Sequence, residues 1–311
     1  MSAFVTGPRG GGDETLPLTG ERTIPGLAEE NYWFRRHEVV YARLADRCAG
    51  RDVLEAGCGE GYGADLIAGV ARRVIALDYD EATVAHVRAR YPRVEIHHGN
   101  LAALPLVDSS VDVVVNFQVI EHLWDQPQFV GECLRVLRPG GLLLMSTPNR
   151  ITFSPGRDTP VNPFHTRELN AAELTELLTT AGFEMEAMLG VYHGPRLREL
   201  DARHGGSIID AQIARAVADA PWPQDLLADV AAVRQPRQMR VQDEGEQPRY
   251  PSVVAHGRTA IATRSRLSSM SSPEVRSKSS MRTAATSARR SCGHGASATA
   301  RAICASMMDP P

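Results

Sequence analysis

The stretch Val53–Gly63, with the sequence VLEAGCGEGYG, decides the fold of this chain. A short apolar strand leads into a glycine-rich turn, and a helical pattern follows directly. Glycines at such a turn let the backbone bend sharply and let a ligand approach without meeting a Cβ atom. In a doubly wound sheet, this kind of turn is where nucleotide-like ligands bind. A tight strand-to-helix connection with no ligand is the alternative interpretation.

The spacing of the glycines narrows the class of ligand. Started at Gly57 or at Gly61, the dinucleotide pattern GxGxxG requires a glycine where Tyr62 or Leu66 stands, so the pattern does not fit. Asp78 stands at the end of the next apolar stretch, at the spacing of an acid that hydrogen-bonds a ribose. We therefore expect the chain to bind a ribose-bearing ligand, and we do not expect it to be a dehydrogenase.

From Arg51 onward the chain alternates between apolar strands and longer helical stretches. Apolar residues recur with helical spacing over 129–137 and 174–181, and Asn170 followed by Glu173 predicts a capping box. This alternation predicts an α/β fold, a doubly wound and mostly parallel sheet covered by helices on both faces. The predicted strands are Asp52–Ala56, Arg73–Leu77, Val94–His98, Val111–Asn116, Gly141–Ser146 and Phe183–Val191.

Charge and composition divide the chain into regions. We expect a flexible leader over 1–27, a helical cap over 28–50, one catalytic domain over 51–235 and a disordered tail over 236–311. Residues 1–233 carry 32 acidic and 21 basic side chains, whereas residues 234–311 carry 5 and 13. This abrupt change is typical of an out-of-frame reading, so we interpret the tail as non-native. A genuine basic tail, with an edge strand within 253–263, is the alternative.

Composition also excludes several classes of protein. Hydrophobic residues make up 43 % of the 311 residues, enough for a sizeable core. No apolar run approaches the roughly 20 residues that span a bilayer, and the N-terminus does not resemble a signal peptide. The five cysteines form no CxxC pair, which suits the cytoplasm. The acidic body lacks the basic face that nucleic-acid binding needs.

The segment Glu55–Gly61 resembles motif I of the class I S-adenosylmethionine-dependent methyltransferases. This resemblance implies a Rossmann-like methyltransferase that uses S-adenosyl-L-methionine. Four further segments continue it in the family's order: Ala76–Asp78, Gly99–Leu101, Val113–His122 and Arg135–Gly141.

A narrower resemblance concerns the acceptor. The chain is similar to bacterial methyltransferases of cell-envelope sugars and polysaccharides, including the actinobacterial group proposed for methylglucose lipopolysaccharide biosynthesis. It implies O-methylation of a sugar hydroxyl on a glycan precursor. The alternatives are a lipid or quinone-like acceptor, or a cofactor-binding module without activity. The segments that carry this resemblance are Thr19–Arg22, Gly59–Gly63, Ser146–Arg150 and Asn162–Glu168.

The family resemblance also implies roles for single residues at the cofactor. The glycine loop would approach the methionine part, Glu55 would receive its ammonium group, and Asp78 would take the ribose hydroxyls. Tyr79 would lie along the adenine, with Asn100 and Leu101 beside its amino group. The loop glycines are Gly57, Gly59 and Gly61.

Four more residues are assigned by the same resemblance. Phe117 and Gln118 would lie beside the transferable methyl group, although many relatives have Glu at position 118. Tyr32 and Arg36 would close over the cofactor from the N-terminal helix. An aromatic staple that fixes this helix to the sheet is the alternative role for the pair.

Methyl transfer to a hydroxyl needs an in-line approach and a group that takes the hydroxyl proton, most often histidine. His122 follows the fourth strand and His165 lies after the fifth, so we expect one of them to be this base. A packing role for His122 and a loop-fixing hydrogen bond for His165 are the alternatives. The histidines and acids show no metal-ligand spacing, so we expect no metal. The sequence leaves the oligomeric state open.

Overall fold

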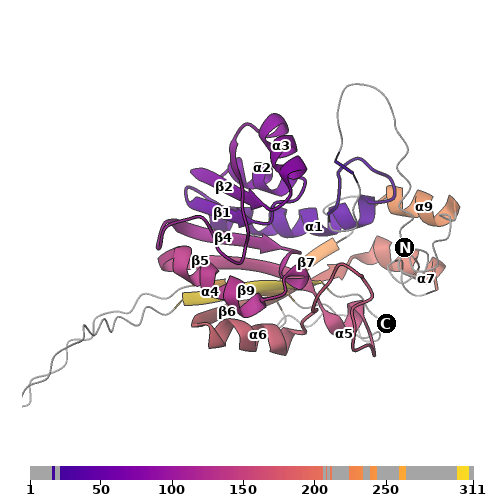
Figure 1. Cartoon of the computed structure of the whole chain (residues 1–311). Coiled ribbons are helices and arrows are strands. Elements are labelled where there is room, and N and C mark those ends of the chain that lie inside the picture. The colour runs from indigo at the N-terminus through magenta and orange to yellow at the C-terminus, as the bar shows by residue number, and fades with distance from the viewer. Residues whose placement is uncertain are drawn as a thin grey trace, which may run out of the picture.

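The computed structural model describes residues 16–17, 22–205, 208, 211, 224–233, 239–243, 259–263 and 300–307 of the 311-residue chain. Its centre is a twisted sheet with helices on both faces (Figure 1). The α/β, doubly wound prediction is therefore confirmed.

The first five strands are parallel and lie in the order β3-β2-β1-β4-β5. Each one begins within four residues of its predicted start and ends within two residues of its predicted end. Their apolar residues form a continuous run because both faces of the sheet are covered. These strands are β1 (Asp52–Ala56), β2 (Arg73–Asp78), β3 (Val94–His98), β4 (Val111–Phe117) and β5 (Leu137–Pro148).

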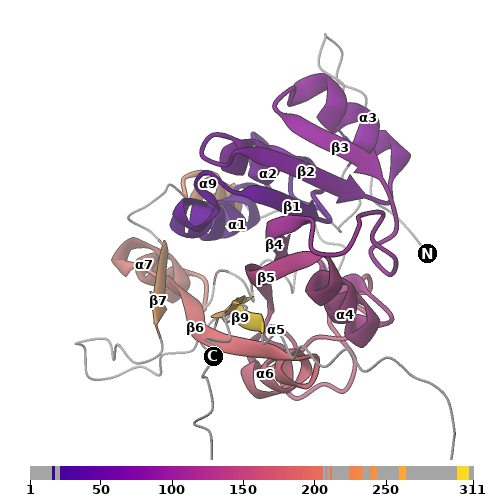
Figure 2. The same ribbon diagram turned by 90° about the vertical axis from the view of Figure 1, so that its left-hand side faces the viewer.

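Helices cover the sheet in two groups, each with its own buried core (Figure 2). On one face lie α1 (Asn31–Leu44), α2 (Tyr62–Ala68) and α3 (Glu81–Arg90). On the other lie α4 (Gln126–Val136) and α6 (Ala171–Thr180). The predicted capping box of α6 is present in the structure. Among the described residues, no helix is long and apolar enough to cross a membrane.

Shorter elements connect these layers. After α1 the chain makes a 3-10 turn, η1 (Ala45–Cys48), and after β4 it makes another, η2 (Ile120–His122). The four-residue helix α5 (Arg150–Phe153) follows β5, with the Asn149 side chain capping its first turn. These turns place the side chains after β4 and β5 at the same edge of the sheet.

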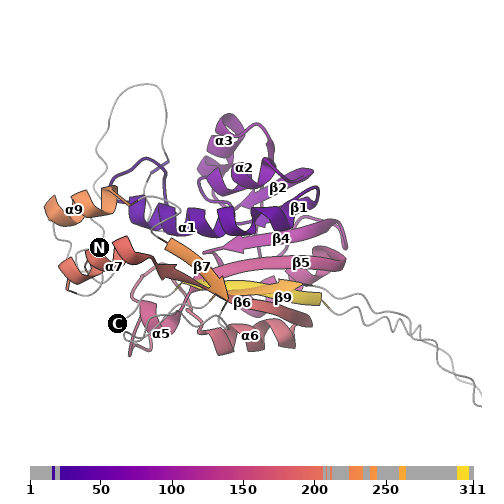
Figure 3. The same ribbon diagram turned by 180° about the vertical axis from the view of Figure 1, so that it is seen from behind.

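The predicted N-terminal cap is helix α1 with η1, and it packs on elements from far along the chain (Figure 3). The Asn31 amide donates to the carbonyl oxygens of Val230, Ala231 and Val233, which lie at the end of α9 (Gln224–Ala231) and just beyond it. The start of α1 is thus bonded to the end of α9, about 200 residues later in the chain.

The elements after β5 complete the sheet. Strand β6 (Phe183–His193) leads into α7 (Pro195–Arg203). Three segments within the predicted tail form strands: β7 (Met239–Asp243), β8 (Thr259–Thr263) and β9 (Ala300–Met307).

The full strand order is β3-β2-β1-β4-β5-β9-β8-β6-β7, with β9 also paired to β6. Strand β9 runs parallel to both β5 and β6, whereas β7 and β8 run antiparallel to β6. These three strands all lie within the predicted tail over 236–311. The rest of that predicted tail, and residues 1–15 and 18–21 of the predicted leader, lie outside the described residues.

Candidate active site

A cavity of about 440 Å³ opens at the carboxyl ends of β1, β2, β3 and β4. This is the position at which parallel α/β sheets bind their ligands. Its described lining is Arg22, Thr23, His37, Tyr41, Gly57, Cys58, Gly59, Glu60, Tyr62, Asp78, Tyr79, His98, Gly99, Asn100, Leu101, Phe117, Gln118, Val119, His122 and Leu123. Most of the predicted cofactor residues are among them.

The glycine loop fixes Asp78 at the floor of this cavity. The Gly59 backbone N–H donates to Oδ2 of Asp78 at 2.9 Å, and the Asp80 N–H donates to Oδ1 at 3.1 Å. Burial raises the pKa of the Asp78 carboxyl group. At Gly57 the backbone has a φ of +84°, and a Cβ atom there would lie 2.7 Å from Val119, so glycine is required. Each oxygen of Asp78 keeps a lone pair for a ligand hydroxyl.

The far wall of the cavity carries the residues predicted for the adenine. The Tyr79 side chain is 65 % exposed there, and Leu101 is buried beside it. The Asn100 Oδ1 atom accepts the Ala102 N–H at 2.9 Å, which leaves it one lone pair for a ligand. An aromatic ring, an apolar side chain and an amide are therefore all part of the cavity lining.

Gln118 has a strained backbone at the end of β4. Its φ is +57°, a conformation that residues other than glycine rarely adopt. Two bonds to Ser146 of β5 hold it: the Gln118 N–H donates to the carbonyl oxygen at 2.8 Å, and Nε2 donates to Oγ at 3.0 Å. Such strain persists where the surrounding structure enforces it, commonly at functional sites. Gln118 and its buried neighbour Phe117 both line the cavity, as predicted.

Glu55 lies behind the cavity wall and does not line it. The Tyr41 hydroxyl donates to Oε1 of Glu55 at 2.5 Å, and Oε2 is buried without a hydrogen-bond partner among the described residues. Burial raises the pKa of Glu55 to about 8. Tyr41 fits here because a Cβ atom on Gly63 would lie 2.1 Å from its ring. Tyr41 therefore lines the cavity in place of Glu55. Motif I did not reveal Tyr41, because this residue lies on α1.

Three other predicted cofactor residues also lie away from the cavity. The Tyr32 hydroxyl lies 2.6 Å from His193 Nε2 and accepts a hydrogen bond from Arg36 at 2.8 Å. His193 in turn donates to Asp201 at 2.7 Å, and this network is buried. Tyr32 and Arg36 therefore fix α1 to β6 and α7, and neither lines the cavity. Gly61 faces side chains of α3.

The predicted leader supplies part of the cavity wall. The Arg22 guanidinium donates to Thr83 Oγ1 at 2.7 Å and to Asp80 Oδ2 at 2.8 Å. Thr23 follows it, and its hydroxyl lies 3.4 Å from His37 Nδ1. The flexible-leader prediction is therefore wrong for Arg22 and Thr23. The sequence analysis used the segment Thr19–Arg22 for the family resemblance, but it assigned no role in the site to these residues.

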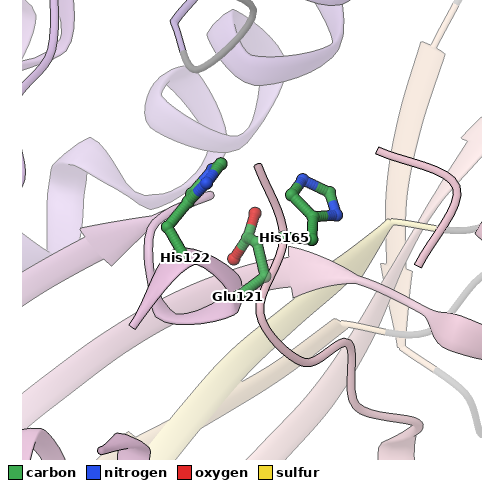
Figure 4. A group of neighbouring side chains, drawn as sticks. All are labelled: Glu121, His122 and His165. Atoms are coloured by element: carbon green, nitrogen blue, oxygen red, sulfur yellow. The ribbon is translucent and has the colours of Figure 1, made fainter. Parts of the chain in front are cut away.

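A histidine cluster adjoins the same cavity. His122 lines it, and the His165 ring lies next to His122, with ring centroids 4.9 Å apart at an angle of 83°. Glu121 lies beside the two rings, and single donor atoms of the three residues lie within 4.8 Å of one another (Figure 4). Burial lowers the pKa of His122 to about 4, so this imidazole is neutral at pH 7. The sequence spacing did not reveal this group, because folding brings Glu121 and His122 to His165.

A second cavity of about 260 Å³ lies beyond the cluster and is lined by polar groups. Glu168 belongs to this lining, and its Oε1 accepts a hydrogen bond from His165 Nδ1 at 2.6 Å. The other lining residues are Arg150, Ser154, Arg157, Asp158, Thr159, Pro160, Thr166, Arg167 and Glu173. His122 thus lines the first cavity, and His165 is connected to the second through Glu168.

Comparisons with known proteins agree with this geometry. A family model described as a methyltransferase domain matches residues 54–145. A probable S-adenosylmethionine-dependent methyltransferase of Mycolicibacterium smegmatis is 86 % identical over 219 residues, 70 % of this chain and 85 % of that protein. One with the same description from Mycobacterium tuberculosis H37Rv is 78 % identical over 218 residues, 70 % and 80 % of the two chains. A ubiquinone biosynthesis O-methyltransferase of Rhizobium leguminosarum is 29 % identical over 161 residues, 47 % and 64 % of the two chains.

Proposed function

Because the chain belongs to the family of S-adenosylmethionine-dependent methyltransferases, we propose that it methylates a sugar hydroxyl on a cytoplasmic glycan or polysaccharide precursor. Methyltransferase activity and S-adenosyl-L-methionine as cofactor follow from the family. The sugar acceptor and the compartment are the proposal. Among the described cysteines, Cys48, Cys58 and Cys133 are buried free thiols, which suits the reducing cytoplasm.

The first cavity fits the methyl donor in shape and chemistry. When bound, S-adenosyl-L-methionine supplies a methyl group on a positively charged sulfur. Asp78 would take its ribose hydroxyls, because both carboxylate oxygens are already fixed by backbone N–H groups. The adenine would lie against Tyr79, Asn100 and Leu101, and the methionine part along Gly57 and Gly59. Tyr41 would contact the ammonium group, and Glu55 would act on it only through the hydrogen bond that it accepts from Tyr41.

The polar lining of the second cavity carries the proposal of a sugar acceptor. Arginine and carboxylate side chains converge there with threonine and serine hydroxyls, and a sugar presents hydroxyls that donate and accept hydrogen bonds. Glu168 connects this cavity to His165, and His165 contacts His122 at the edge of the donor cavity. A hydroxyl bound between the cavities would therefore meet both imidazoles. We propose His122 and His165 as the residues that activate it.

A lipid or quinone-like acceptor is the second candidate. Its support is the ubiquinone biosynthesis relative and three apolar side chains exposed near the histidines. Trp124 follows His122 and Leu123 and is 92 % exposed, and Ile151 and Phe164 are also exposed. These side chains lie at the surface, whereas the second cavity, which Glu168 connects to His165, has the polar lining. The sugar is therefore the better-supported acceptor.

An acceptor panel with methyl-labelled donor tests the proposal. It contains short glucans, partly methylated glucans and a short-chain quinol, each incubated with the full chain. We expect label in the glucans, and we expect Arg157→Ala to raise the KM for the glucan several-fold. Arg198→Ala, on the surface of α7, serves as the control. Label in the quinol alone would replace the sugar by the second candidate.

A further inference from the structure

Three side chains at the edge of the donor cavity form a group with the composition of a metal centre. Glu121 and His122 come from turn η2, and His165 comes from a loop 43 residues later in the chain. Donor atoms of all three lie within 4.8 Å of one another (Figure 4). Two imidazoles and one carboxylate are the ligand set of many sites for divalent transition metals.

An outer hydrogen bond orients each member of this group. His122 Nδ1 donates to the Phe164 carbonyl oxygen at 3.0 Å, and His165 Nδ1 donates to Glu168 Oε1 at 2.6 Å. Thr147 Oγ1 donates to Glu121 Oε2 at 2.9 Å. Metal-binding histidines typically use one ring nitrogen in this way, donating to a carboxylate or a carbonyl group. The arrangement leaves Nε2 of both histidines and Oε1 of Glu121 as the metal-binding atoms.

His165 Nε2 has one protein neighbour that an ion would displace. The Asn162 amide Nδ2 lies 3.1 Å from it and donates to its lone pair. This bond identifies Nε2 as the unprotonated nitrogen of His165, the form in which an imidazole binds a metal. The Asn162 Oδ1 atom also accepts the Phe164 N–H at 3.0 Å, so binding of the ion requires this side chain to move.

A buried polar atom gives a second, independent reason to expect a cation. Glu121 is 1 % exposed and Glu168 is 2 % exposed. The Glu168 Oε2 atom is buried and has no hydrogen-bond partner among the described residues. A buried polar atom is costly unless a partner satisfies it. A cation bound at the neighbouring group would supply charge of the right sign beside this oxygen.

We propose that Glu121, His122 and His165 bind one divalent transition-metal ion, Zn²⁺ or Mn²⁺, with open positions toward the donor cavity. Glu168, Phe164 and Thr147 are its outer partners. Three protein ligands with open positions are typical of catalytic and not of structural metal sites. His122 lines the donor cavity, so the open positions face the space where methyl transfer takes place.

The chemical role of the ion rests on the proposed function. The acceptor hydroxyl oxygen binds the ion, its pKa falls, and its proton passes to water. That oxygen forms the new bond to the methyl carbon as the carbon–sulfur bond breaks, and the electron pair of the broken bond stays on sulfur. The two histidines then act as metal ligands, so neither is the proton acceptor.

Metal binding is measured on the full chain without acceptor, so that the result does not depend on the proposed function. The chelator-treated protein is titrated with zinc or manganese chloride alone by calorimetry, and bound metal is counted by elemental analysis. We expect one equivalent per chain, lost in Glu121→Gln and in His165→Gln. The outer-partner variant Glu168→Gln should weaken binding by about 10–100-fold. Donor binding by calorimetry confirms that each variant is folded.

His97→Asn is the matched control, because His97 also contacts a carboxylate, Glu95, at 2.9 Å but on the surface. It should bind metal like the unaltered chain. A protein that binds neither ion, or whose Glu121→Gln variant binds as tightly, overturns the proposal. Methylation of glucans that persists in excess chelator also overturns it, while leaving the proposed function intact. Metal binding without glucan methylation would overturn the proposed function alone.

Discussion

The donor cavity and the histidine cluster adjoin each other but are built in different ways. Gly59, Asp78 and Asn100 each lie within a few residues of the carboxyl end of a parallel strand, so the strand order alone brings them together. The cluster joins η2 to a loop from beyond β5, and only tertiary packing brings His165 to His122.

This difference in construction separates two functions, one at the donor cavity (the donor side) and one at the histidine cluster and its loop (the acceptor side). The donor side depends on short strand–loop–helix connections that the fold repeats, and it serves a cofactor common to the whole family. The acceptor side depends on a particular loop, 154–169, and on its bonds to Glu121. The carbonyl oxygen of Glu121 accepts the Thr166 N–H at 2.7 Å. Changes on the two sides should therefore be separable in experiments.

The largest separation is expected from His165→Ala. Loss of a group that activates the hydroxyl typically lowers the rate by about 10²–10⁴-fold. Because the group acts in the transition state and not on the donor, turnover should fall while donor affinity stays unchanged. Single-turnover kinetics and calorimetry with the donor measure the two quantities. Near-normal turnover in both His165→Ala and His122→Ala would show that positioning alone drives the reaction.

A pH series on Glu55 addresses the donor side through stability. Its pKa in the folded chain is about 8, against an ordinary value of 4.5. The folded state thus holds a proton that the unfolded state releases, so the free energy of unfolding should fall as the pH rises from 5 to 8. The slope reaches up to about 1.4 kcal/mol per pH unit. Glu55→Gln should lose this slope in urea unfolding series, and a Gln variant as pH-dependent as the unaltered chain would contradict the assignment.

Asp78→Ala should lower the affinity for the donor, which His165→Ala should leave unchanged. It strands the donor's ribose hydroxyls and the Gly59 and Asp80 N–H groups, at roughly 1–3 kcal/mol for an unsatisfied buried group. We expect donor affinity to fall about 5- to 150-fold, with the fold intact by circular dichroism. Asp65→Ala is the control, since Asp65 pairs with Arg93 at the surface. Unchanged affinity would remove Asp78 from the site.

The smallest effect is expected when the chain ends at Val233. The described residues that line the donor cavity lie between Arg22 and Leu123, so donor affinity should stay within about two-fold. The melting temperature should fall, because β9 no longer pairs with β5. This tests our proposal that residues 236–311 are not part of the working enzyme. A folded truncated chain that binds no donor would instead make β9 a support of the site.

Much of the donor side could be predicted because it follows local rules. The glycine loop and the five parallel strands came from patterns within a few residues of one another. Asp78 came from its spacing to that loop, and Asn100 from the family resemblance. Tyr41 could not be predicted, since it reaches Glu55 from another element and depends on the space that Gly63 leaves. The grouping of Glu121, His122 and His165 could not be predicted for the same reason, because Glu121 and His165 are 44 residues apart.

The position of α1 couples donor binding to the docking of this helix against the rest of the chain. His37 and Tyr41 are both on this helix and both line the donor cavity, so a donor binds well only while α1 is docked. By linkage, a donor at about one hundred times its Kd stabilises the docked helix by roughly 2.7 kcal/mol. Backbone amides of α1 should then exchange with deuterium about a hundred times more slowly.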